Sequence, residues 1–259
     1  MQIGKCRLCL QEKELINRSH ILSDFFYRDI YGEDHEAYVI PLSSLGTAKK
    51  VQTGEFEGGI LCQDCDNRIL GGYEKYGAAF IFGTQANNVL PNVRAENQVH
   101  PDGELKSTHI VNIDYAALKL FLLSLLWRAS ISTRPFFQHV NLGKYEEEVR
   151  QMLLLGDPGT QMKFPCLVNI VTGENKDISR ELIPTPTKFR TENCIGYLFP
   201  IGRMVFRYFV SPTGVPDFIN QLAVSEDGKM RVIHLDGKAS DKHMKFILGD
   251  ALHDHLLKT

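Results

Sequence analysis

Two short cysteine pairs constrain the fold of this chain more than any other feature of its sequence. The first pair is Cys6 and Cys9, and the second is Cys62 and Cys65, each with the spacing C-x-x-C. Two such pairs supply four thiolates, which is the ligand number of a closed structural zinc site. We therefore predict that these four cysteines bind one zinc ion.

The separation of the pairs predicts how such a site is built. Because 52 residues lie between them, the site is not a compact zinc finger. We expect one pair on a loop knuckle and the other at a helix N-terminus, where the helix dipole favours thiolates. Two alternatives remain open, namely two unrelated reduced pairs and an iron–sulfur site. The other two cysteines, Cys166 and Cys194, lie in apolar strand-like runs and are expected in the core.

Composition places the chain among globular proteins. It has 259 residues, of which 43% are hydrophobic and 23% are charged, and these are ordinary globular values. The first residues lack the apolar segment of a signal peptide. The most apolar run, residues 115–131, contains Lys119 and Arg128, which favours a core helix over a membrane span. We expect a soluble, cytoplasmic protein that makes no membrane contact.

The charge distribution excludes strong non-specific attraction to nucleic acid. The formal net charge is −2. Residues 1–80 contain 9 Lys and Arg against 12 Asp and Glu, a net charge of −3. A chain without a basic surface gains little bulk electrostatic attraction to phosphates. Any phosphate contact must therefore be local.

The order of helix and strand patterns predicts an α+β fold. Residues 114–132 have the strongest helix pattern, with Asp114 as a plausible cap. Helix and strand runs do not alternate regularly, so a βαβ architecture is not indicated. We place a boundary near residue 85, between a zinc-binding domain (1–85) and an α+β C-terminal domain (86–259). Helices are expected at 22–31, 62–82, 114–132, 143–155 and 240–257, and strands at 14–21, 38–42, 164–171, 194–199, 204–210 and 230–235.

Several motifs together resemble a known enzyme family. A C-x-x-C, then an isolated His that ends a strand, then Leu-C-x-x-C that opens a helix, resembles the zinc-containing HNH (His-Me finger) nucleases. The resemblance is more specific to a group of bacterial proteins described as HNH-endonuclease-like. The segments that carry it are Cys6-Arg-Leu-Cys9, Ser19-His20-Ile21, Leu61-Cys62-Gln-Asp-Cys65-Asp66, Tyr73-Glu74 and Leu123-Ser-Leu-Leu-Trp127-Arg128.

The resemblance implies a fold and a set of site residues. The fold would be a zinc-stabilised ββα unit of the HNH, treble-clef-like kind. His20 would be the general base that activates water. Asp66 stands where the family usually has a metal-binding Asn and would hold Mg²⁺ or Mn²⁺, with Asn67 or Glu74 assisting. Ser19 stands where a further metal ligand is usual, so one ligand of the family pattern is missing.

Two functions follow as expectations. The first is a metal-dependent HNH-type endonuclease, a hydrolase that cuts DNA phosphodiester bonds and acts in defence against phage or other foreign DNA. The alternative is a zinc-binding module that has lost its catalytic metal and serves nucleic-acid or protein recognition within a larger assembly. The acidic first 80 residues favour either the module or a nuclease that relies on a protein partner for DNA binding.

Overall fold

The computed structural model describes residues 2–28, 37–40, 49–51, 54–83, 90–99, 106–172, 182–190, 194–210, 215 and 218–235. The helices are α1 (Phe25–Arg28), the π-helix η1 (Asp64–Leu70), α2 (Gly71–Phe82), α3 (Tyr115–Ile131), the 3₁₀ turns η3 (Pro135–Phe137) and η4 (Gly143–Tyr145), α4 (Glu146–Leu155) and α5 (Ile219–Leu222). The strands are β1 (Gln2–Lys5), β2 (Glu12–Leu15), β3 (Ser19–His20), β4 (Ala37–Ile40), β5 (Lys49–Val51), β6 (Phe56–Glu57), β7 (Arg94–Val99), β8 (Lys106–Val111), β9 (Cys166–Val171), β10 (Leu182–Pro184), β11 (Thr187–Arg190), β12 (Ile195–Ile201), β13 (Met204–Phe209) and β14 (Met230–Leu235).

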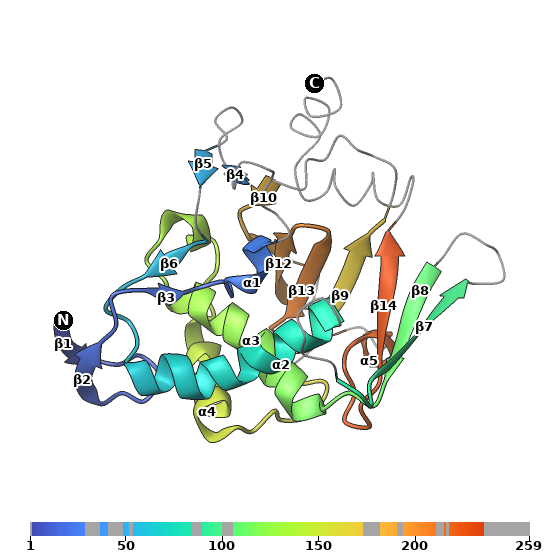
Figure 1. Ribbon diagram of the computed structural model, residues 1–259, viewed down its shortest axis with the longest axis horizontal. Coiled ribbons are helices and arrows are strands. Elements are labelled where there is room, and N and C mark those ends of the chain that lie inside the picture. Colours follow the sequence, from blue (N-terminus) through green and yellow to red (C-terminus); the bar gives the residue numbers. More distant parts are fainter. Residues whose placement is uncertain are drawn as a thin grey trace.

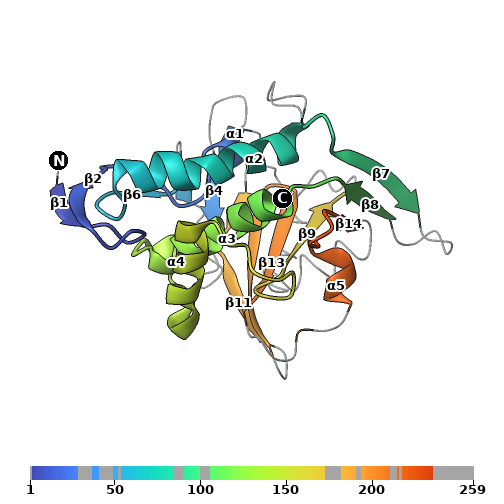
Figure 2. The same cartoon turned by 90° about the horizontal axis from the view of Figure 1, so that it is seen from below.

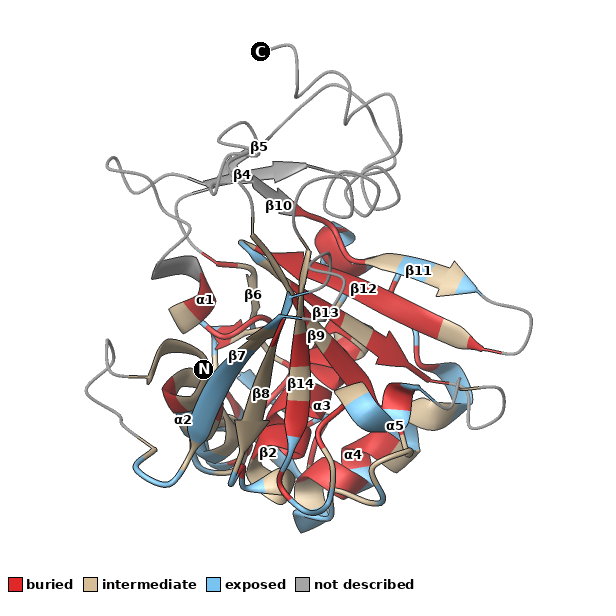
Figure 3. Cartoon of the chain, turned by 90° about the vertical axis from the view of Figure 1, so that its right-hand side faces the viewer, coloured by how far each residue is buried: buried red, intermediate tan, exposed pale blue. Residues whose placement is uncertain are grey.

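A seven-stranded mixed sheet is the largest element of this α+β fold. Its order is β11-β12-β13-β9-β14-β8-β7, with β9 and β14 parallel and all other neighbours antiparallel. Helices α3 and α2 lie over one face, with α3 between α2 and the sheet (Figures 1 and 2). Figure 3 shows the central strands buried and the edge strand β7 exposed. The short helix α5 packs with Leu167 and Phe209. Because side chains alternate along a strand, these two residues lie on the other face of the sheet.

Helix α3 is the centre of the hydrophobic core, as its sequence predicts. Leu122 and Leu126 are buried, and so are residues on all the other sides of the helix. This pattern is typical of a helix enclosed by other elements. The side chain of Asp114 caps it by accepting a hydrogen bond from the amide of Ala117 at 3.0 Å. The hydroxyl of Tyr208 on β13 donates to the carbonyl of Leu122 at 3.0 Å and anchors the helix to the sheet.

Near the N-terminus, one expected strand is split into two. The sequence pattern predicts a single strand over residues 14–21, but β2 ends at Leu15 and β3 contains only Ser19 and His20. The reason is a change of partner. β2 pairs with β1, whereas the amide of Ile16 donates to the carbonyl of Leu61 at 2.9 Å, and β3 pairs antiparallel with β6. The chain therefore turns from one neighbour to another at Ile16.

Other sequence predictions have mixed outcomes. The hairpin over 194–210 is confirmed, with β12 and β13 joined at Gly202, whose φ of 57° suits glycine. The helix over 62–82 is confirmed, although it is a π-helix before Gly71 and an α-helix after it. The expected helix over 143–155 begins as the 3₁₀ turn η4 before α4. The helix expected over 240–257 lies outside the described residues.

Residues on both sides of position 85 share one core. A single cluster of buried side chains contains Leu8 and Cys65 as well as Phe121 and Tyr208. Polar contacts also cross this position, because the carboxylate of Glu57 on β6 accepts hydrogen bonds from the hydroxyls of Ser132 and Thr133 after α3. No described helix combines the length and the apolar character needed to cross a membrane.

The closest approach of α2 to α3 depends on a glycine. A Cβ built on Gly77 would lie 2.5 Å from ring carbons of the buried Phe121. We expect Gly77→Ala to lower the free energy of unfolding by about 1–3 kcal/mol, because the added methyl group would displace a fully buried ring. Gly72, in the same helix, is the matched control, since its Cβ would meet nothing within 4 Å. Gly72→Ala should raise stability by about 0.5–1 kcal/mol. Urea unfolding checks both, and equal effects would contradict this packing.

Candidate functional site

The four cysteines of the two pairs come together, as predicted. Their sulfur atoms all lie within 4.8 Å of one another, and they form the one group of three or more potential metal ligands found among the described residues. A tetrahedral zinc with Zn–S bonds of about 2.3 Å needs sulfur atoms about 3.8 Å apart. The donor set and its size therefore fit a structural zinc ion.

Local structure explains how each pair reaches this position. Cys6 and Cys9 lie in the turn between β1 and β2, where Leu10 adopts a positive φ of 60° and its amide donates to the carbonyl of Cys6 at 2.9 Å. Cys62 and Cys65 lie at the start of the η1–α2 helix. The amide of Arg7 donates to the carbonyl of Ile60 at 2.9 Å, which joins the knuckle to the chain just before the second pair.

The surroundings of the sulfur atoms favour a bound cation. Burial would raise the pKa of Cys6, but hydrogen bonds from the amides of Cys9, Cys62 and Leu8 outweigh it and lower that pKa. Burial and the nearby charge of Cys6 raise the pKa of Cys65. Four thiolates held this close repel one another, and a divalent cation removes that repulsion.

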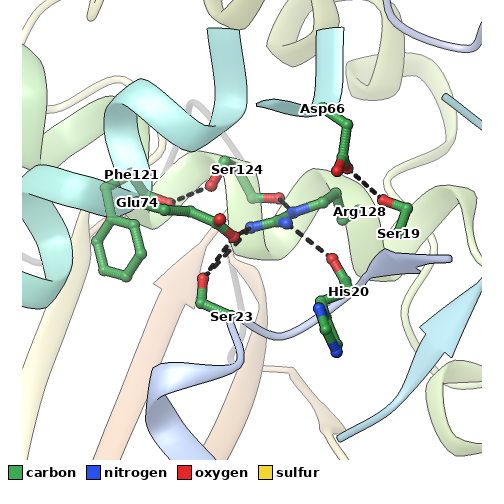
Figure 4. A network of polar contacts seen from close by, with 8 residues as sticks. All are labelled: Ser19, His20, Ser23, Asp66, Glu74, Phe121, Ser124 and Arg128. Atoms are coloured by element: carbon green, nitrogen blue, oxygen red, sulfur yellow. Dashed lines mark hydrogen bonds and ion pairs between the residues drawn. The ribbon is translucent and has the colours of Figure 1, made fainter. Parts of the chain in front are cut away.

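A second cluster joins three of the four residues that the sequence analysis assigns to catalysis. Figure 4 shows His20, Asp66 and Glu74 arranged around the guanidinium of Arg128. They come from β3, η1 and α2, while Arg128 belongs to α3. Residues 20 and 128 are therefore brought together by tertiary packing rather than by any local motif.

Arg128 organises this cluster from within the core. Its residue is 1% exposed, and one terminal nitrogen, Nη2, lies 2.6 Å from the Glu74 carboxylate. The other terminal nitrogen, Nη1, donates to the main-chain carbonyl of His20 at 2.7 Å. The hydroxyl of Ser23 donates to Glu74 at 2.7 Å. Burial would raise the pKa of Glu74, but the charge of Arg128 and the Ser23 hydrogen bond outweigh it, so this pKa is lowered.

Asp66 is tied to the residue that precedes His20. The hydroxyl of Ser19, which is buried, donates to Oδ1 of Asp66 at 2.6 Å. Burial raises the pKa of Asp66, and the Ser19 hydrogen bond and the charge of Arg128 oppose this without cancelling it. Ser19 thus positions the Asp66 carboxylate.

The main chain of His20 is hydrogen-bonded to Arg128, but its imidazole ring is not. In Figure 4 its carbonyl points to Arg128, while its ring points away from Arg128 and Asp66. Nε2 is shielded from solvent and has no hydrogen-bond partner. Oδ1 of Asp24 is 3.7 Å from it, which is too long for a hydrogen bond. The ring packs edge-on against Phe56 on β6, with centroids 6.4 Å apart.

Asn67 is not part of this cluster. Its side chain is exposed and contributes to an open groove of about 730 Å³ beside the second cysteine pair. The groove is lined by Lys13, Glu14, Leu15, Ile16, Asn17, Cys62, Gln63, Asp64, Asn67 and Arg68. The structure therefore brings together His20, Asp66 and Glu74, and leaves Asn67 on another surface.

Two polar residues of the cluster were not foreseen as site residues. Ser23 lies just before α1, and Arg128 belongs to the core helix α3. The one signal for Arg128 was a charged residue within an apolar helix, because a buried arginine needs a partner. The identity of that partner depends on packing between α2 and α3.

Comparison with known proteins does not extend this description. No family model, no curated protein and no solved structure matches the chain. The functional argument consequently depends on the geometry of these two clusters.

Zinc removal is the first test of this site. Purified protein should contain about one zinc per chain with Zn–S distances near 2.3 Å, measured by elemental analysis and X-ray absorption. Cys65→Ser or a strong chelator should remove zinc and unfold residues around both pairs, because binding energy of this kind is also folding energy. Cys194→Ala, in the core outside the site, should keep its zinc. Iron in place of zinc, or a Cys65→Ser variant with unchanged metal content and melting temperature, would contradict the prediction.

The Glu74–Arg128 pair should appear as a pH-dependent contribution to stability. We expect Glu74→Gln to lower the free energy of unfolding by about 3–5 kcal/mol at pH 7, because it leaves a buried guanidinium without a counter-charge. The folded-state pKa of Glu74 is lowered. Its contribution is therefore complete above the unfolded pKa of about 4.3 and lost as pH falls through the folded pKa.

A surface ion pair is the matched control for this measurement. Glu148 pairs with Lys163 at 2.7 Å, and their side chains are 43% and 40% exposed. Glu148→Gln should change stability by less than about 1 kcal/mol. Chemical unfolding between acidic and neutral pH measures both variants. A Glu74→Gln effect as small as the control, or one that is constant with pH, would show that the buried pair does not stabilise the fold.

Proposed function

We propose that the chain is a zinc-stabilised, metal-dependent endonuclease of the HNH type that hydrolyses DNA phosphodiester bonds. The main observation that supports this is the order strand, strand, helix formed by β3, β6 and η1–α2. In this order His20 ends one strand and Asp66 lies near the start of the helix, and the 2.6 Å hydrogen bond from Ser19 to Asp66 joins the two elements. In this proposal residues 1–85 form the nuclease unit and residues 86–259 support it.

The proposed roles follow from the contacts of each side chain. His20 takes a proton from the attacking water, which its unpaired ring nitrogen suits. Asp66 would hold Mg²⁺ or Mn²⁺, and one of its two carboxylate oxygens accepts the Ser19 hydrogen bond. One or two carboxylates with water and substrate phosphate are a usual set for Mg²⁺. The cation supplies charge neutralisation at the scissile phosphate. Asn67 lies on the neighbouring groove and has no part in this mechanism.

Glu74 acts by positioning in this mechanism. Its carboxylate is engaged by Arg128 and Ser23, and Arg128 in turn holds the main chain of His20. A carboxylate with these partners is poorly suited to bind a metal as well, because metal binding would separate it from a buried guanidinium. Glu74 therefore keeps His20 in place through Arg128.

The acidic net charge of residues 1–80 bears on how the proposed enzyme would reach its DNA. Because residues 1–80 have a net charge of −3, unaided DNA binding is expected to be weak. A protein partner or a larger assembly would then bring the DNA to His20. Defence against foreign DNA is consistent with such an enzyme.

A second candidate function is a recognition module without catalysis. It is favoured by the same contacts, since Asp66 and Glu74 both accept hydrogen bonds within the protein. The shielding of His20 Nε2 from solvent also favours it. Within the described residues, no group of three metal ligands other than the cysteines is preassembled. In this case His20 and its neighbours serve to stabilise the fold.

The His20→Ala variant separates the two candidates. The nuclease predicts a loss of plasmid nicking of about 10²–10⁴-fold in Mg²⁺ or Mn²⁺, because a general base contributes this much. Zinc content and melting temperature should stay near those of the wild type. If the chain is a recognition module, the wild-type protein should not cut DNA in the presence of any divalent ion. Cleavage at full rate by His20→Ala would end the HNH assignment.

A further inference from the structure

The outer side of the β3–β6 ribbon has an exposed cation next to His20. The guanidinium carbon of Arg18 lies 4.3 Å from the centroid of the Phe56 ring, and His20 makes a T-shaped contact with the same ring. Side chains alternate along extended backbone. Arg18 and His20 therefore share one side, while Ser19 between them points inward to Asp66. Phe56 holds both groups at this surface.

Arg18 takes part in none of the ion pairs formed among the described residues. Four other arginines near the two clusters are in ion pairs, namely Arg68 with Asp64, Arg128 with Glu74, Arg134 with Glu55 and Arg150 with Glu147. Arg18 is exposed, and no carboxylate among the described residues pairs with it, although residues 1–80 have an excess of acidic side chains. Its position over an aromatic face restricts the side chain without using its hydrogen-bond donors.

We propose that Arg18 binds a phosphate of the DNA strand on which His20 acts. A guanidinium presents a rigid fork of donors that matches phosphate oxygens. Phe56 holds that fork close to the His20 ring before substrate arrives, so less side-chain freedom is lost on binding. In a chain of negative net charge, such a local contact is the form that phosphate recognition must take. This inference rests on the proposed function, because it takes DNA as the substrate.

Salt-dependent DNA binding tests the inference. Full-length, zinc-loaded protein is titrated against a short fluorescein-labelled DNA duplex and against its single strand, with Ca²⁺ present to prevent cleavage. Each phosphate contact changes the slope of log K against log salt by about 0.9 on duplex DNA. Arg18→Ala should therefore weaken binding and reduce the slope by about one. Arg18→Lys, which keeps the charge, should retain most of the slope. The form of DNA that shows this dependence identifies the strand preference.

A control variant makes the outcome specific. Arg68→Ala removes an exposed arginine of the Asn67 groove and should leave the slope unchanged. The inference is overturned if Arg18→Ala keeps the wild-type slope, if Arg68→Ala alone reduces it, or if the wild type binds neither form of DNA. If wild-type and His20→Ala proteins cleave equally, or not at all, while Arg18→Ala loses binding, the nuclease assignment fails and the Arg18 contact stands.

Discussion

A single buried guanidinium holds the parts of this protein together. Arg128 lies within the most apolar helix of the chain, and its charge can remain there only because Glu74 from α2 neutralises it. The same group binds the carbonyl of His20. One side chain therefore sets the distance between α3, α2 and β3. Removing one partner of a buried ion pair costs far more than a surface pair contributes, so this arrangement resists small displacements of any of the three elements.

The four cysteines provide the second fixed point, and they act on shorter segments. The knuckle between β1 and β2 and the start of the η1–α2 helix are short elements that place Leu8 and Leu70 in the common core. Their four sulfur atoms lie within 4.8 Å of one another, and a zinc ion bound there would add to their stability, because metal-binding energy is also folding energy. The helix is then held at its first turn by the cysteines and in its second half by Gly77 against Phe121.

These two constraints determine what the polar cluster can do. His20 is fixed through its main chain, which leaves its imidazole without a hydrogen bond. Because side chains alternate along the strand, adjacent residues face opposite sides of it. Ser19 points inward and orients Asp66, whereas His20 and Arg18 share the outer side against Phe56. On the outer side, the His20 imidazole and the Arg18 guanidinium lie against one aromatic ring. Both groups suit a phosphodiester, and this is the physical basis of the proposed nuclease.

Local pattern alone determined the cysteine cluster, helix α3, the β12–β13 hairpin and the α+β class, because ligand spacing, helix capping and turn glycines act over a few residues. It also marked His20, Asp66 and Glu74 through a family resemblance. Only the tertiary structure decided that Glu74 faces Arg128, that Ser19 faces Asp66 and that Asn67 lies on a separate groove. The break of the expected strand at Ile16 was decided in the same way. Each of these outcomes depends on a partner that is distant in sequence, and a carboxylate on a helix looks the same in the sequence whether it meets solvent or a buried guanidinium.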